Sequence, residues 1–137
     1  MRGRRPSQRH HPRTAVTTDV TAPAALTERR GNVLVITLNR PEARNAVSPE
    51  VHRAMIAAWA DFAEDDSVDV AILTGAGEAF CAGADLKTYI PPVVRNATPH
   101  DIREIVELGL NGFTRGMHRI PKPIIGAVNG WALAGGL

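Results

Sequence analysis

Apolar runs and helical patterns alternate along residues 33–74. Residues 33–38 form a six-residue apolar run rich in β-branched side chains, which predicts a buried strand. Ser48 followed by Pro49 is typical of a helix N-cap and first turn. A second buried strand is expected over residues 68–74. The helix between the strands has apolar residues at three- and four-residue spacing, which predicts one core face: Val51, Met55, Ala58, Trp59 and Phe62.

The alternation continues to the end of the chain. Thr98 and Pro99 repeat the cap pattern, and Pro121 ends the long amphipathic helix that this pattern predicts. A third short strand is expected over residues 124–128. The order strand, helix, strand, helix, strand predicts an α/β fold with parallel strands, and ligand sites favour the loops at the ends of such strands.

Composition supports one soluble domain or part of one. The chain has 137 residues, of which 44% are hydrophobic and 22% charged. It contains no apolar run of about 20 residues, and its start lacks the apolar centre of a secretory signal, so we expect a cytoplasmic protein without a membrane-bound part. Cys81 is the only cysteine, which excludes an internal disulfide.

The net charge of +2 comes from the N-terminal tail. Residues 1–13 hold five arginines and no acidic residue, and without these five the chain has 11 basic and 14 acidic residues. We expect residues 1–30 to be a disordered, solvated basic extension. A targeting or nucleic-acid role for the tail and a mis-assigned start are the alternatives. The tail has no aromatic residue on which a base could stack, so we expect no nucleic-acid partner.

Two loops of small residues carry the candidate chemistry. FCAGADLK occupies residues 80–87 and NGWALAGGL occupies residues 129–137, each after a predicted strand. Small side chains expose peptide N–H groups, and two such groups converging on one oxygen would form an oxyanion hole, assisted by the dipole of a helix beginning near Gly135. The alternative is that the glycines only permit tight turns or close packing.

Three segments in order resemble the enoyl-CoA hydratase/isomerase (crotonase) family. They are LNRPEARNA from residue 38, GAGEAFCAGADLK from residue 75, and PKPIIGAVNGWALAGGL from residue 121. The resemblance implies the crotonase-like ββα superhelix, or spiral, truncated before its C-terminal part. Residues 31–137 are then the N-terminal part of an acyl-CoA-binding domain.

The resemblance also implies roles for individual residues. The peptide N–H groups of Ala84 and Gly135 are expected to hold the thioester carbonyl oxygen. Further contacts with coenzyme A, which enters as part of the substrate and not as a permanent cofactor, are expected from the first loop and from one arginine of the preceding motif: Ala82, Ala84, Asp85, Leu86, Lys87 and Arg44. Family subunits usually assemble as homotrimers or as hexamers formed from two trimers.

The family's hydratases move protons with two glutamates, and both matching positions follow Leu137. We therefore expect an enzyme of thioester enolate chemistry, with hydration of a 2-enoyl-CoA in fatty-acid-type metabolism as the leading reaction, whose first 137 residues alone are inactive. The alternative is a truncated, non-catalytic remnant or fragment with at most weak acyl-CoA binding.

Other site readings are weaker. Gly75-Ala76-Gly77 after a strand resembles a dinucleotide loop, but Phe80 stands where the third glycine is needed. Cys81 has no histidine nearby in sequence, which disfavours a nucleophile. The five histidines lack ligand spacing, so we expect no metal site.

Overall fold

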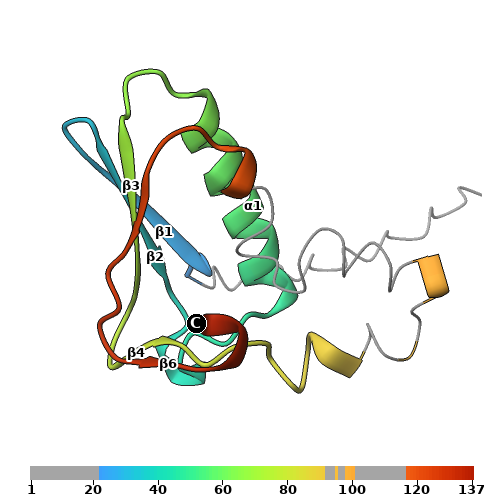
Figure 1. Ribbon diagram of the computed structural model, residues 1–137. Coiled ribbons are helices and arrows are strands. Elements are labelled where there is room, and N and C mark those ends of the chain that lie inside the picture. Colours follow the sequence, from blue (N-terminus) through green and yellow to red (C-terminus); the bar gives the residue numbers. More distant parts are fainter. Residues whose placement is uncertain (1–21, 92–94, 96–97, 101–116) are drawn as a thin grey trace, which may run out of the picture.

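A four-stranded sheet forms the centre of the computed structural model, which describes residues 22–91, 95, 98–100 and 117–137 (Figure 1). The strand order is β1 (Ala25–Arg30), β2 (Val33–Leu38), β3 (Val70–Gly75) and β5 (Ile124–Gly126). β2, β3 and β5 are parallel, and β1 is antiparallel to β2. The predicted parallel α/β arrangement is therefore confirmed.

Helix α1 (Pro49–Glu64) covers one side of this sheet (Figure 1). The Ser48 side chain accepts a hydrogen bond from Val51 N–H at 3.3 Å, so the predicted N-cap is confirmed. All five residues of the predicted apolar stripe are buried in one cluster with residues of β2 and β3. The core thus lies between α1 and the sheet.

A second, two-stranded parallel sheet lies beside the end of the first. It consists of β4 (Ala79–Cys81) and β6 (Trp131–Ala132). Figure 1 shows this pair at the foot of the main sheet, with the chain end close to it. Short 3-10 helices lie at Pro41–Ala43 (η1), Met117–Arg119 (η2) and Ala134–Gly136 (η3). Both predicted small-residue loops therefore adjoin the small sheet.

Strand β1 corrects the prediction that residues 1–30 are disordered. The strand is held by backbone pairing with β2. Its six residues are mostly exposed and show no apolar alternation, which is the pattern that would have predicted a strand. Gly31 at φ +63° and Asn32 form the two-residue connection, a glycine-first hairpin signal that the sequence contains. Residues 1–21 lie outside the described residues.

The remaining elements agree with the prediction in part. β3 and β5 begin or end within two residues of their expected bounds, whereas residues 79–81 are a strand where a loop was expected. Most of the second predicted helix, residues 101–116, lies outside the described residues; Pro99 and His100 at its start are helical. No helix in the described part is long and apolar enough to cross a membrane.

Candidate functional site

The first loop leaves β4 and pairs with the segment that precedes α1. Val47 N–H donates to Gly83 O at 2.8 Å, and Asp85 N–H donates to Val47 O at 2.9 Å. In such a parallel bridge the peptide groups of the residue between, Ala84, point away from the partner. Ala84 N–H has no acceptor among the described residues, so it is available to a ligand.

The second loop follows β6 and is fixed against β4. Leu133 N–H donates to Cys81 O at 3.0 Å, and Gly136 N–H donates to Leu133 O at 2.8 Å. A Cβ at Gly136 would lie 2.2 Å from Cys81 O, so only glycine allows this approach. Within the described ranges Gly135 N–H meets no acceptor.

The two loops meet, although about 50 residues separate them in sequence. A Cβ built on Gly83, at φ +90°, would lie 2.9 Å from Leu133 O and 3.4 Å from Gly135 N. The backbones of the two loops are therefore in direct contact next to Ala84. At the second loop the structure has the three-residue 3-10 helix η3, and the helix expected to begin near Gly135 stays a prediction.

A cavity of about 610 Å³ opens along the first loop. All six residues expected to contact coenzyme A line it, together with three from the loop of η1: Ala82, Ala84, Asp85, Leu86, Lys87, Arg44, Glu42, Ala43 and Ala46. The structure thus brings together two segments that the sequence places 40 residues apart. Gly135 is not among the lining residues; its peptide nitrogen lies at the contact with Gly83.

Arg40 ties the two walls of this cavity to each other. Its guanidinium Nη1 donates to Ala46 O at 2.8 Å and to Asp85 Oδ2 at 3.1 Å. The Asp85 side chain is 11% exposed, which strengthens the ion pair relative to one in open water. The Arg40 side chain was not predicted to contribute to the site.

Asp85 orders the first loop. Its Oδ1 accepts hydrogen bonds from Lys87 N–H at 2.9 Å and from Thr88 N–H at 3.1 Å. Burial acts to raise the pKa of Asp85, but the hydrogen bonds from Lys87, Arg40 and Thr88 lower it overall. A carboxylate held in its charged form by these three hydrogen bonds is a weak base, and the bonds order the loop.

Two cations stand at the rim of the cavity. Arg44 and Lys87 are exposed and form no ion pair with any described residue. Arg44 has a left-handed backbone at φ 50°, and its carbonyl accepts a hydrogen bond from Ala82 N–H at 3.0 Å. Both charges are therefore placed to meet an anionic group at the surface.

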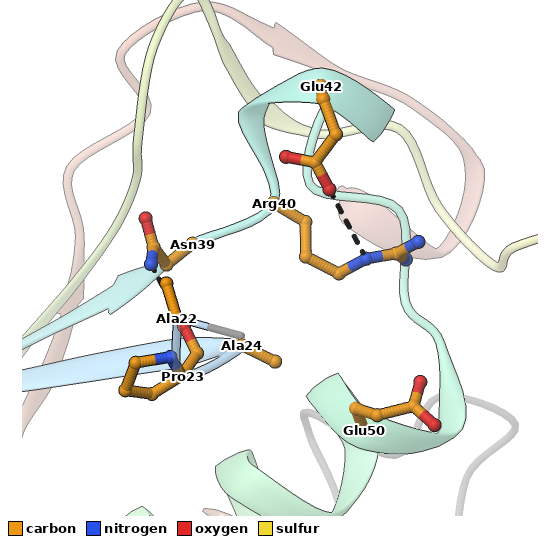
Figure 2. A pocket seen from close by; sticks show the side chains of 7 residues that line it. All are labelled: Ala22, Pro23, Ala24, Asn39, Arg40, Glu42 and Glu50. Carbon is orange, nitrogen blue, oxygen red and sulfur yellow. Dashed lines mark hydrogen bonds and ion pairs between the residues drawn. The ribbon is translucent and has the colours of Figure 1, made fainter. Parts of the chain in front are cut away.

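A separate pocket of about 560 Å³ is lined by Arg40, Glu42 and Glu50, together with Asn39 and residues 22–24 (Figure 2). Figure 2 shows Arg40 extended between η1 and the start of α1, with Glu50 across the opening. The distance from Arg40 Nε to Glu42 Oε1 is 3.8 Å. The carboxylates of Glu42 and Glu50 are 71% and 63% exposed. Residues 80–87 and 129–137 are called the two donor loops from here on. Neither contributes a residue to the lining of this pocket.

Within the described residues, Cys81 and the histidines form no second site. Burial raises the pKa of the Cys81 thiol, although a hydrogen bond from Gly83 N–H at 3.4 Å opposes that shift in part. The thiol is fully buried and stays protonated, unlike a nucleophile. In the described part of the chain, no three His, Cys, Asp or Glu side chains come together as a metal site would require.

Two asparagines in the site region were missed by the sequence reasoning. Asn45 is fully buried at φ 54°, and its Oδ1 accepts a hydrogen bond from Arg40 N–H at 2.9 Å. Asn129 bonds to the backbone around Gly75. Their position beside small residues could have identified them, because asparagine tolerates the left-handed region and its side chain bonds to nearby peptide groups.

The comparisons with known proteins follow the same segments. A family profile described as enoyl-CoA hydratase/isomerase matches residues 28–137. The chain belongs to the enoyl-CoA hydratase/isomerase family. The family resemblance drawn from the three sequence segments is thereby confirmed, as is the α/β crotonase-type fold.

Individual members of the enoyl-CoA hydratase/isomerase family cover most of this chain. Enoyl-CoA hydratase EchA19 of Mycobacterium tuberculosis is 44% identical over 83% of the chain and 42% of its own length. Mevalonyl-coenzyme A hydratase of Aspergillus fumigatus is 44% identical over 77% of the chain and 37% of its own length. The solved structure of a carnitinyl-CoA dehydratase from Mycobacterium avium matches with a TM-score of 0.66 and 49% identity, over 84% of this chain and 43% of that one. The chain thus spans about two fifths of its relatives' length.

Proposed function

We propose that this chain binds the thioester of an acyl-CoA and stabilises its enolate. The observation that supports the proposal is the contact of the two loops at Gly83: Ala84, which lines the cavity, and Gly135, next to the contact, both have a peptide N–H without an acceptor among the described residues. In the mechanism, both N–H groups donate to the thioester oxygen. Each such donor contributes roughly 3–4 kcal/mol when negative charge develops on the oxygen.

The rest of the substrate fits the cavity along the first loop. Main-chain groups and small side chains at Ala82 and Ala84 allow the pantetheine chain to lie close to the backbone, and exposed Leu86 offers an apolar contact. Arg44 and Lys87 then meet the phosphates of coenzyme A as fixed charges. Coenzyme A is part of the substrate, and the mechanism uses no permanent cofactor.

The reaction we favour is hydration of a 2-enoyl-CoA in fatty-acid-type metabolism. Hydratases among the similar proteins support this choice, and their named substrates differ, so the acyl group stays open. Residues 1–137 include the two proposed oxygen-binding donors, Ala84 and Gly135, whereas the two glutamates are expected after Leu137. We infer that these residues alone bind the thioester and do not hydrate it efficiently.

The complete protein is proposed to act as a trimer or hexamer in the cytoplasm. The support is the family membership and the exposure of large apolar side chains beside the site, such as Trp131 and Leu133 at 68% and 50%. Such side chains are commonly covered at interfaces. The alternative is the non-catalytic remnant, which would bind acyl-CoA weakly.

Calorimetric titration of the chain with crotonyl-CoA tests the proposed function. We expect binding, a shift of the thioester carbonyl stretch to lower frequency, and weaker binding of the thioether analogue that lacks the carbonyl. Arg44→Ala should weaken binding, whereas the matched control Arg53→Ala, which removes an exposed arginine from α1, should not. An unshifted carbonyl in bound crotonyl-CoA would contradict the oxyanion hole.

A further inference from the structure

The turn that joins β3 to β4 is held by side chains from two distant segments. The first is Asn45, whose Nδ2 donates to Ala76 O at 2.9 Å and to Ala79 O at 2.8 Å. Because Asn45 is fully buried, these hydrogen bonds are shielded from water. They join the loop of η1, which forms one wall of the cavity, to the entry of β4.

The second side chain is Asn129, which precedes β6. Its Nδ2 donates to Gly75 O at 2.9 Å and to Gly77 O at 3.0 Å. Its Oδ1 accepts from Gly75 N–H at 3.1 Å and from Thr74 Oγ1 at 3.3 Å. The amide of Asn129 thus pairs with both polar groups of Gly75, as a neighbouring strand would.

Direct backbone packing continues this contact toward the donor loops. A Cβ at Gly130 would lie 2.0 Å from Glu78 O, so the chain after Asn129 lies directly on the turn. The next residues form β6, in which Trp131 is opposite Ala79 and Ala132 is opposite Cys81. This register sets where Leu133 N–H meets Cys81 O, and hence where the second loop meets the first.

We propose that Asn45 and Asn129 act as a pair of positioning residues for the oxyanion hole. They bond to one turn from two segments far apart in the sequence, so the register of β6 on β4, and with it the Gly83–Gly135 contact, is fixed. A strand of two residues has few ladder bonds of its own, and a side-chain clamp supplies the missing constraint. The role of the pair in oxyanion binding rests on the proposed function. The hydrogen bonds of the two asparagines to the turn are present in the ligand-free chain.

The test compares Asn129→Ala with Asn39→Ala in the isotopically labelled 137-residue chain. Asn39 is the matched control, because its Nδ2 also donates to a main-chain carbonyl, Pro23 O at 2.9 Å, away from the turn and from both donor loops. Two readouts need no ligand: hydrogen exchange of the Gly75 amide, and the cross-peak between a Gly83 α-proton and the Gly135 amide proton.

Asn129→Ala should make the Gly75 amide exchange roughly tenfold faster and should remove the Gly83–Gly135 cross-peak, while Asn39→Ala leaves both unchanged. Asn129→Asp is a second variant that keeps the acceptor for Gly75 N–H and loses the donors, so it should lose the cross-peak and keep the amide protected. A full-intensity cross-peak in both Asn129 variants would overturn the clamp.

Titration with crotonyl-CoA separates this inference from the proposed function. If the unaltered chain binds the probe and polarises its carbonyl, Asn129→Ala should reduce the carbonyl shift and Asn39→Ala should not. If the unaltered chain fails to bind while the ligand-free readouts respond as expected, the proposed function fails and the clamp stands.

Discussion

Replacing Gly83 by alanine tests the junction of the two donor loops most directly. The new Cβ would lie 2.9 Å from Leu133 O and 3.2 Å from Ala134 Cβ. Carbon–oxygen contacts are ordinarily about 3.3 Å or longer, so the loops must separate by roughly 0.4 Å. The strained backbone at φ +90° and the overpacking together should cost about 2–6 kcal/mol of unfolding free energy.

Gly31→Ala is the matched control for the backbone term. Gly31 also has a positive φ, +63°, but nothing lies within 4 Å of its Cβ position. Its substitution should cost only about 1–2 kcal/mol and leave the site unchanged. Denaturant unfolding measures both losses, and calorimetric titration with crotonyl-CoA measures the consequence for binding.

The two variants should differ most in binding. We expect roughly tenfold weaker crotonyl-CoA binding for Gly83→Ala, since small displacements of preorganised groups are costly, and unchanged binding for Gly31→Ala. Equal stability losses together with equal affinities would refute the reasoning, because they would mean that Gly83 is needed only for its backbone conformation.

Four further variants test the core, the helix end and the first loop. Phe62→Ala empties a fully buried core position and should lower the unfolding free energy by about 3–5 kcal/mol in urea titration. Lys122→Met removes hydrogen bonds to the Phe62 and Asp65 carbonyls at 2.9 and 2.6 Å, and should cost about 1–3 kcal/mol by the same assay. Lys87→Met, whose ammonium has no partner among the described residues, should stay within about 0.5 kcal/mol of the original. Asp85 has a lowered pKa in the fold, so its stabilisation is complete above its ordinary pKa of 3.8 and is lost as the pH falls through the folded value. The unfolding free energies of the original and Asp85→Asn proteins should therefore converge as the pH falls below 3.8 and through the lowered folded pKa, and a constant difference would contradict this account.

Local pattern was sufficient for the elements that bury an apolar face. The run at Val33–Leu38, the cap at Ser48 and the stripe of α1 were all readable, because strand and helix periodicities are properties of neighbouring residues. The identities of the donor residues came from the family resemblance. Local pattern failed at β1, whose exposed residues are ordered by pairing with β2.

The meeting of the two donor loops was decided only by the tertiary structure. The sequence shows two stretches of small residues, and nothing local fixes the register that sets Gly83 against Gly135. That register depends on parallel strands far apart in the chain and on the hydrogen bonds of Asn45 and Asn129 to one turn. Small residues permit a close backbone approach, but which backbones approach is determined by long-range packing.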